Sequence, residues 1–352
     1  MTLTKCITAL AVAVLAALTI AGATTAAAPG NAYTVHNLVS DEPGVADHQD
    51  PNLVNAWGLA ALPGSPWWVA DNETSVATLY NADGTARPLV VQVPNAPTGE
   101  VANSGPNFEL VAGGGNPALF LWATEEGKIL AWNPSLTPIN RAVVVADRSG
   151  AGAIYKGLAI AGNRLYAADF HHARVDVFNE NFGLVSMPGA FVDPGIPAGF
   201  APFGIQEVGG KILVGYAKQD ADAEDEVAGQ GLGFVDAFNT SGALLGRVAT
   251  RGQLNAPWGL ARAPNNFGRF SNDLLVGNFG DGEINAYEPQ ADGTYERVGA
   301  LKDTNGNPIL IDGLWALQFG HGALVNNGPT NALFFTAGPD DETHGLFGKI
   351  TP

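Results

Sequence analysis

The side chains best suited to chemistry in this sequence are carboxylates, carboxamides and imidazoles that follow short apolar segments at regular intervals. Asp71, Glu125, Asp169 and Asn278 each stand at, or directly after, the end of such a segment, and His171 follows Asp169 by two residues. Oxygen ligands of this kind suit calcium or magnesium, whereas an imidazole in the set favours zinc, copper or iron. These five residues are therefore candidate ligands of one divalent metal ion.

Two other interpretations of the same residues stay open. In the first, His171 or His172 carries protons beside Asp169 in general acid–base catalysis without a metal, which makes His171 the candidate catalytic residue. In the second, Asp and Asn end these segments only because their side chains cap turns. One such residue in each repeat is not a strict ligand motif, so the pattern alone does not decide between the three.

The placing of these residues follows from an internal repeat, of which residues 156–179 are the clearest copy. Each copy has a Gly-Leu-like opening, a second apolar segment, and a third segment that usually ends on an aromatic residue followed by Asn or Glu. The second segments end at equivalent residues that lie 45 to 60 positions apart: Asp71, Thr124, Asp169, Lys218, Asn278 and Ala337. Six copies of one unit predict six similar sheets.

The repeat predicts an all-β fold, a six-bladed β-propeller of four-stranded antiparallel blades. Fourth strands are predicted after the first five units, at residues 88–93, 141–146, 189–192, 244–250 and 296–301. The sixth unit has none, whereas residues 33–39 (YTVHNLV) alternate like a strand and precede the first unit. We expect this N-terminal strand, from Tyr33 to Val39, to join the last blade and close the ring, because closure removes exposed sheet edges.

This architecture gathers polar side chains at one end of the channel. In a blade whose strands run up and down, the loop after the second strand lies at the same end as the connection to the next blade. Further candidates at this channel mouth are three residues on connections and two on loops after second strands: His48, Asp50, Lys156, Asp220 and His344. Residues 220–233 begin with DADAEDE. We predict that this long acidic loop is a solvated flap, with a lid over the binding face as the alternative.

Composition and charge restrict the partners of the protein. Of its 352 residues, 45 are Gly and 23 are Pro, which fits many tight turns between short strands. The formal net charge of −17 argues against nucleic acid or an anionic membrane surface as partner, since phosphate binding needs the opposite sign. We expect a monomer that binds a small molecule or a protein, with one divalent ion, calcium or a transition metal, as its only cofactor.

The N-terminal residues 1–28 have the features of a signal peptide. Lys5 precedes an apolar run over residues 7–21, and small residues follow the run. Because this run is short for a membrane span, we expect cleavage and a secreted or periplasmic protein without a membrane anchor. A single propeller domain is then expected over residues 29–352. Cys6 is the only cysteine and lies before the run, so the mature protein would contain no disulfide.

Several motifs together resemble a family of exported bacterial proteins of uncharacterised function. They are NLVSD (37–41), DPNLVNAWGLA (50–60), YKGLAIA (155–161), YAADFHHARVDVF (166–178), YAKQDAD (216–222), APWGLA (256–261), LLVGNFGDGEINAY (274–287) and FFTAGPDDETHGLFG (334–348). Some members of that family carry a Pro-Glu-Pro-type C-terminal sorting tag. This sequence ends without the tag, so we expect a released protein.

More distantly, the order of these segments is similar to that of NHL-repeat and gluconolactonase-like six-bladed propellers. Members of the gluconolactonase-like group are metal-dependent lactone or ester hydrolases, with a Glu, an Asn and an Asp at the channel mouth. The similarity implies that Asp71, Glu125, Asp169 and Asn278 are ligands of the same kind.

Three classes of function follow from these patterns. The first is an exported propeller that binds a small ligand, a divalent ion or a partner at the channel mouth. The alternative is a metal-dependent lactone or ester hydrolase that uses the same face, with His171 as proton acceptor. The third class is a protein-interaction platform whose contacts lie on outer loops such as residues 220–233.

Overall fold

The computed structural model describes residues 30–111 and 114–352. The predicted signal peptide, residues 1–28, lies outside the described residues. Within the described ranges, no helix is long and apolar enough to cross a membrane. The helical elements among the described residues are two single 3-10 turns, η1 (Ser149–Ala151) and η2 (Gly268–Phe270).

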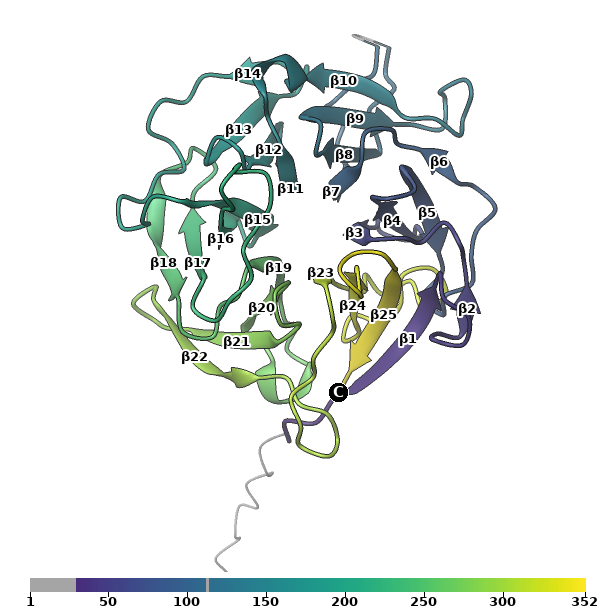
Figure 1. The fold of residues 1–352 in the computed structure, drawn as a ribbon. Helices are drawn as coiled ribbons and strands as arrows, with labels where there is room; N and C mark the ends of the chain where they lie inside the picture. The colour runs from purple at the N-terminus through teal and green to yellow at the C-terminus, as the bar shows by residue number, and fades with distance from the viewer. Residues whose placement is uncertain (1–29, 112–113) are drawn as a thin grey trace, which may run out of the picture.

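The strands form six sheets. The sheets are arranged in a ring around a central axis, as Figure 1 shows. Blade 1 contains β3 (Ala56–Ala60), β4 (Trp67–Asp71), β5 (Val76–Tyr80) and β6 (Val91–Gln92). Blade 2 contains β7 (Pro97–Ala102), β8 (Phe120–Thr124), β9 (Lys128–Trp132) and β10 (Val143–Asp147). Blade 3 contains β11 (Tyr155–Ala161), β12 (Arg164–Asp169), β13 (Arg174–Asn179) and β14 (Leu184–Val185).

Blades 4 to 6 follow the same order from the channel outward. Blade 4 contains β15 (Phe200–Val208), β16 (Lys211–Lys218), β17 (Gly233–Phe238) and β18 (Leu244–Thr250). Blade 5 contains β19 (Pro257–Arg262), β20 (Leu274–Asn278), β21 (Ile284–Pro289) and β22 (Tyr295–Ala300). Blade 6 contains β23 (Leu314–Phe319), β24 (Leu333–Ala337), β25 (Leu346–Thr351) and β1 (Thr34–Ser40), with the short β2 (His48–Gln49) parallel to β1.

The predicted six-bladed propeller and its closure by the N-terminal strand are confirmed. β1 pairs antiparallel with β25, so that Thr34 lies opposite Thr351 and Ser40 opposite Leu346. All six second strands end at the predicted residues, from Asp71 in β4 to Ala337 in β24. The first and last parts of the described chain thus complete one blade, as Figure 1 shows.

The predicted fourth strand of blade 3 is wrong. The strand is β14, paired with β13, and residues 189–191 form a turn instead. The Asn179 side chain accepts a hydrogen bond from the Gly183 amide at 2.9 Å, which tightens the hairpin and brings β14 alongside β13 early in the chain. Phe191 then turns inward and packs against Phe238 with 5.3 Å between ring centres. Phe191 thus packs in the core between blades 3 and 4 and is not part of a strand.

Close approach of the inner strands explains the glycine in five of the six openings. A Cβ on Gly58 would lie 2.5 Å from the Thr98 carbonyl oxygen of blade 2, which no side chain tolerates. The residue that follows this position lines a small cavity, and in five blades it is aliphatic: Leu59, Leu158, Ile205, Leu260 and, after Ala316, Leu317. In blade 2 this position holds Glu100.

Six aromatic residues fill the channel near its mouth, and we call them the aromatic plug: Trp57, Phe170, Phe203, Trp258, Phe279 and Trp315. The Trp57 and Trp315 rings stack with 3.6 Å between their centres, and Phe279 stacks on Trp315 at 4.1 Å. Side chains that point into the channel mouth therefore pack against the aromatic plug.

Candidate functional site

Lys156 is a buried cation at the channel mouth. It lies at the start of β11, its side chain is only 2% exposed, and its Nζ lies 2.7 Å from Glu125 Oε1 and 2.8 Å from Asp225 Oδ1. The Trp57 ring centre lies 5.2 Å from the same nitrogen. Burial alone would lower the pKa of Lys156, but the neighbouring carboxylates outweigh it and raise the pKa above its ordinary value. Lys156 is therefore a fixed positive charge.

The acidic loop between β16 and β17 folds over the mouth and supplies Asp225. His171 Nδ1 lies 3.2 Å from the Ala223 carbonyl oxygen of this loop, and Gln219 Nε2 donates to the Phe170 carbonyl oxygen at 2.6 Å. Within the loop, the Asp220 carboxylate accepts the Glu224 amide at 3.0 Å. The loop is thus docked on blade 3, and Asp220 is a turn cap rather than part of the mouth.

The β24–β25 loop supplies a further carboxyl group to the channel mouth, that of Glu342. Asp340, Asp341 and Glu342 have φ angles of 54°, 53° and 67°, a left-handed run that non-glycine residues rarely adopt and that is common at functional sites. This turn brings Glu342 Oε2 within 2.6 Å of the Asn55 Nδ2 that donates to it. Asn55 Oδ1 in turn accepts the Trp315 indole N–H at 3.0 Å, which ties the loop to the aromatic plug.

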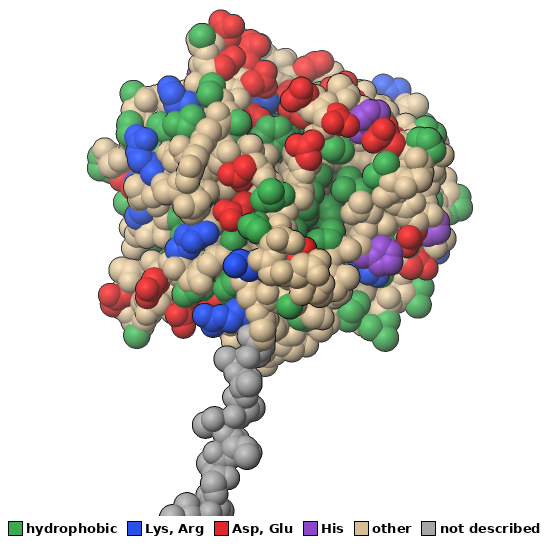
Figure 2. Space-filling model, turned by 60° about the horizontal axis from the view of Figure 1, so that its bottom comes forward, with side chains coloured by type: hydrophobic (Ala, Val, Ile, Leu, Met, Phe, Trp, Pro, Cys, Tyr) green, Lys and Arg blue, Asp and Glu red, His purple; other side chains and the backbone are tan. Residues whose placement is uncertain are grey.

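We call Lys156, Glu125, Asp225, Glu226 and Glu342 the mouth cluster. It contains four carboxyl groups and one cation, and Lys156 contacts two of these groups, those of Glu125 and Asp225. Burial raises the pKa of Glu226 to about 8, although Lys156 opposes the shift. Burial also raises the pKa of Glu342, against the effects of Asn55 and Lys156. Figure 2 shows Asp and Glu side chains gathered around a hollow with hydrophobic side chains inside it.

Of the predicted metal ligands, no three among Asp71, Glu125, Asp169 and His171 bring ligand atoms within 4.8 Å of one another in residues 30–111 and 114–352. Asp71 and Asp169 are fully buried, Asp71 without a hydrogen-bond partner in the described part of the chain, and Asp169 against His172 Nδ1 at 2.9 Å. Asn278 donates to Asp281 Oδ1 at 3.0 Å, and His171 supports the acidic loop. Among the predicted residues, Glu125 and Lys156 lie together in the mouth cluster.

Of the remaining candidates, Asp50 and His48 lie near the rim of blade 1. Asp50 Oδ2 accepts the Tyr80 hydroxyl at 2.9 Å, and His48 is exposed on β2. His344 Nδ1 lies 2.8 Å from Asp41 Oδ2, and this hydrogen bond raises the pKa of His344.

A cluster that the sequence analysis missed lies beside His344, and we call it the rim cluster: Glu42, Asp340 and His344. Their ligand atoms all lie within 4.8 Å of one another, which holds for no other group of three or more His, Cys, Asp or Glu in residues 30–111 and 114–352. Glu42 follows the closing strand, and the other two lie on the last β24–β25 loop. Because the predicted ring closure pairs β1 with the last blade, it also indicated that the segment after β1 and the β24–β25 loop lie close together.

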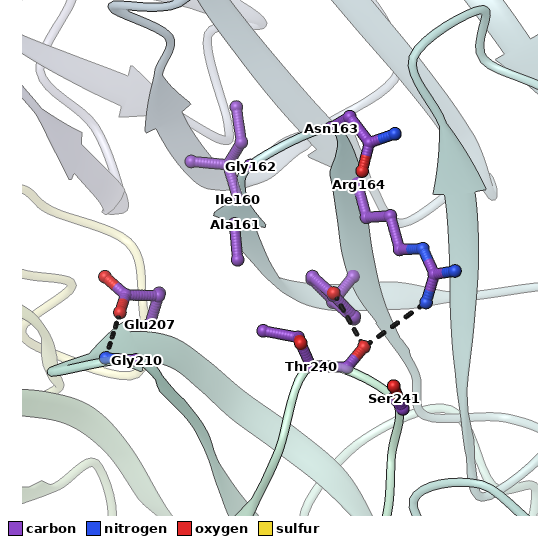
Figure 3. A pocket seen from close by; sticks show the side chains of 10 residues that line it. Ile160, Ala161, Gly162, Asn163, Arg164, Glu207, Gly210, Thr240 and Ser241 are labelled. Carbon is purple, nitrogen blue, oxygen red and sulfur yellow. Dashed lines mark hydrogen bonds between the residues drawn. The ribbon is translucent and has the colours of Figure 1, made fainter.

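At the opposite end of the channel, the charged side chains around one cavity are already bound to backbone groups. A cavity of about 570 Å³ lies there between blades 3 and 4 (Figure 3). Its two charged side chains are engaged with the backbone: Arg164 donates to the Thr240 carbonyl oxygen at 3.4 Å, and Glu207 accepts the Gly210 amide at 2.7 Å.

Comparison with known proteins places the chain among relatives. It is 34% identical over 332 residues to the uncharacterized protein R648 of Acanthamoeba polyphaga mimivirus, covering 90% of this chain and 80% of that protein. It is 33% identical over 335 residues to the uncharacterized protein L690 of the same virus, covering 90% and 85%. The chain belongs to the family of these two proteins. No family model matches it.

Solved structures support the fold of this family. A Bacteroides thetaiotaomicron structural genomics protein of unknown function superposes with a TM-score of 0.57 at 9% identity, covering 91% of this chain and 76% of that one. The PQQ-bound aldose sugar dehydrogenase of Streptomyces coelicolor superposes with a TM-score of 0.56 at 13% identity, covering 92% and 99%. Identities this low establish a shared propeller architecture only.

Proposed function

We propose that the protein binds a small organic cation, such as a protonated amine, at the channel mouth. The observation that carries this proposal is the convergence of four carboxylates around one buried lysine, beneath a docked acidic loop. Lys156 contacts Glu125 and Asp225 directly, so one lysine charge faces two carboxylates, and a bound cation would also stabilise the ionised form of Glu226, whose pKa burial raises to about 8. A positively charged ligand would balance this excess, whereas an anion would add to it.

The spacing of these carboxylates favours an extended cation over a single metal ion. No three of them, within residues 30–111 and 114–352, bring ligand atoms within 4.8 Å of one another. An ion such as calcium needs several oxygens at about 2.3–2.6 Å. A diamine reaches carboxylates several ångströms apart, and its apolar chain suits the aromatic plug.

The test is calorimetric titration of the protein with 1,4-diaminobutane, succinate and 1,4-butanediol. These compounds share a four-carbon chain but differ in charge. We expect heat from the diamine alone, reduced affinity in Glu226→Gln and Glu342→Gln, and loss of affinity at high salt. Asp222→Asn is the matched control, since Asp222 lies on the same loop but outside the mouth cluster. Equal binding of succinate, or diamine binding untouched by both variants, would overturn the proposal.

A second candidate function is metal-assisted hydrolysis of an ester or lactone at the rim cluster, and one specific observation favours it. The Asp41 carboxylate binds His344 Nδ1, and His344 Nε2 lies 3.8 Å from Glu42 Oε1. A carboxylate that orients a ligand imidazole in this way is a common feature of metal centres. Three protein ligands would leave coordination positions for water and substrate.

Elemental analysis after incubation with zinc tests this second candidate. We expect one equivalent in the wild-type protein and none in His344→Ala, with His321→Ala as the control imidazole. Ester hydrolysis that depends on zinc and on His344 would support the enzyme. Equal zinc content in the two proteins would exclude it.

A further inference from the structure

The cavity between blades 3 and 4 has the size of a small-molecule site. It measures about 570 Å³, and Figure 3 shows the side chains that line it. Three strand-to-strand turns contribute to its walls: residues 162–163 after β11, Gly210 after β15, and residues 240–241 after β17. All three turns lie at the end of the channel opposite the mouth cluster, because the strands of a blade run alternately up and down. Ligand pockets in proteins usually measure about 300–1,000 Å³.

On the blade 3 side, the cavity is lined by Arg164, a cation without an anionic partner among the described residues. Its Nη1 donates to the Thr240 carbonyl oxygen at 3.4 Å and lies 3.9 Å from Met187 Sδ. No carboxylate oxygen in the described part of the chain lies within 4.0 Å of its nitrogens, whereas Arg174, on β13 of the same blade, pairs with Asp169. A guanidinium has five N–H donors in a planar fork, so Arg164 can still bind a carboxylate through two of them.

On the blade 4 side, the cavity is lined by Glu207 of β15. Its Oε1 accepts the Gly210 amide at 2.7 Å, which holds the carboxylate against the turn that follows β15. Within residues 30–111 and 114–352, no lysine or arginine nitrogen lies within 4.0 Å of this carboxylate. Arg164 and Glu207 are both partly buried and line one cavity, but they do not pair with each other. The cavity thus keeps two opposite charges apart.

The wall between the two charges is aliphatic. Ile160 and Ala161, at the end of β11, line the cavity and are partly buried, and in Figure 3 they lie between Glu207 and Arg164. A simple anion would bind the arginine but face the carboxylate, and a simple cation would meet the opposite difficulty. A ligand that carries both charges, one at each end of an apolar chain, matches all three parts of the wall.

We propose that this cavity binds a zwitterion whose carboxylate and ammonium groups are separated by an aliphatic chain, such as an ω-amino acid. The ligand carboxylate would accept two N–H donors of Arg164, its ammonium would bind Glu207, and its chain would lie over Ile160 and Ala161. This zwitterion site shares no residue with the mouth cluster or the rim cluster. It therefore does not depend on the function proposed above.

The test is calorimetric titration of the protein with 6-aminohexanoate and with 6-acetamidohexanoate, which keeps the carboxylate but lacks the ammonium charge. We expect 6-aminohexanoate to bind more tightly by about tenfold or more, since each charged contact contributes over about 1.4 kcal/mol. Arg164→Gln and Glu207→Gln should each weaken its binding to a similar extent. Arg164→Lys keeps the positive charge and should retain most of the affinity.

Matched control variants are Arg141→Gln, before β10 of blade 2, and Glu296→Gln, on β22 of blade 5, because both side chains are exposed and lie outside the cavity. Both should bind 6-aminohexanoate like the wild type. Equal affinity for the two compounds, or a wild type that binds neither, would overturn the proposal. Equal losses in Arg164→Gln and Arg164→Lys would do so as well, since the arginine charge would then not matter. Binding that Glu226→Gln weakens and Arg164→Gln does not would place the compound at the mouth cluster instead.

Discussion

The Lys156 ammonium and the Asp225 carboxylate form an ion pair of 2.8 Å between two very different environments. The lysine side chain is 2% exposed and the aspartate side chain 71% exposed. The buried partner belongs to an inner strand, whereas the exposed partner belongs to the acidic loop, 69 residues further along the chain. The pair therefore joins the rigid channel wall to a segment that can move away from it.

Asp225→Asn should free the acidic loop without unfolding the ring. Because Asp225 is largely exposed and Glu125 remains on Lys156, the loss of unfolding free energy should be below about 1 kcal/mol. Amide hydrogen exchange of residues 220–226 should accelerate, while exchange in β11 stays slow. Asp222→Asn is the control on the same loop. Unchanged loop exchange in Asp225→Asn would show that other contacts dock the loop.

Lys156→Met should destabilise the protein strongly. Removing one partner of a buried ion pair costs about 3–5 kcal/mol, and the lower end applies because the Glu125 side chain is 31% exposed. Urea unfolding measures the loss. Lys128→Met, which breaks the surface pair with Glu126, should cost less than about 1 kcal/mol. If Lys156→Met costs no more than this control, the mouth cluster does not depend on its lysine.

The Glu125 partner can be tested by a double variant. In Lys156→Met with Glu125→Gln, the buried cation and the less exposed of its two direct carboxylate partners are both removed. The total loss should therefore be smaller than the sum of the two single losses. Strict additivity in urea unfolding would mean that the two side chains do not interact.

Glu226 should make the stability fall as pH rises. Its pKa is raised from 4.5 to about 8 in the folded protein, so the folded state binds the proton more tightly than the unfolded state. The stability contributed by this proton is complete below pH 4.5, decreases between pH 4.5 and 8, and is lost above pH 8. The difference in unfolding free energy between the wild type and Glu226→Gln should follow this course. A difference that is constant from pH 5 to 8 would contradict it.

Leu38→Ala should weaken the closure of the ring. Leu38 is 1% exposed on β1 and packs in the core between blades 6 and 1. Truncation of a buried leucine costs about 2–5 kcal/mol. Val35→Ala on the same strand is the control, because Val35 is 38% exposed and should cost no more than about 0.5 kcal/mol. Equal losses for the two variants in urea unfolding would show that closure does not rest on the core face of β1.

The repeat predicted the strands well because the residue types in the adjoining turns determine where each strand ends. The same symmetry does not bring the predicted metal ligands together, for a reason visible at Asp71. Side chains alternate along a strand, so Asp71 shares a face with Trp67 and Val69, which pack in the core between blades 6 and 1. The second-strand ends share an orientation, as symmetry requires, but this orientation is toward a neighbouring blade and not toward the axis.

The mouth cluster could be predicted only in part. Lys156 and Glu125 follow from the repeat phase, whereas Glu342 depends on a left-handed turn that no local pattern of Asp and Glu indicates. Glu100 was detectable, because aligning the six openings sets one acidic residue against five aliphatic ones. A residue whose type differs from that of its equivalents at a repeated buried position therefore indicates an unusual local environment. Polar residues that all the loop ends share indicate this less clearly.

The pairing of β1 with β25 also fixes an order of events during synthesis. The ribosome makes residue 34 long before its partner, residue 351. At about 5–20 residues per second, β1 waits roughly 15–60 s before its partner exists. Five blades can form during this interval, but the sixth cannot, so its unpaired edges stay open to other chains until β25 has been made. Cells that make many copies of this protein at once must therefore keep the unfinished chains from associating through these edges.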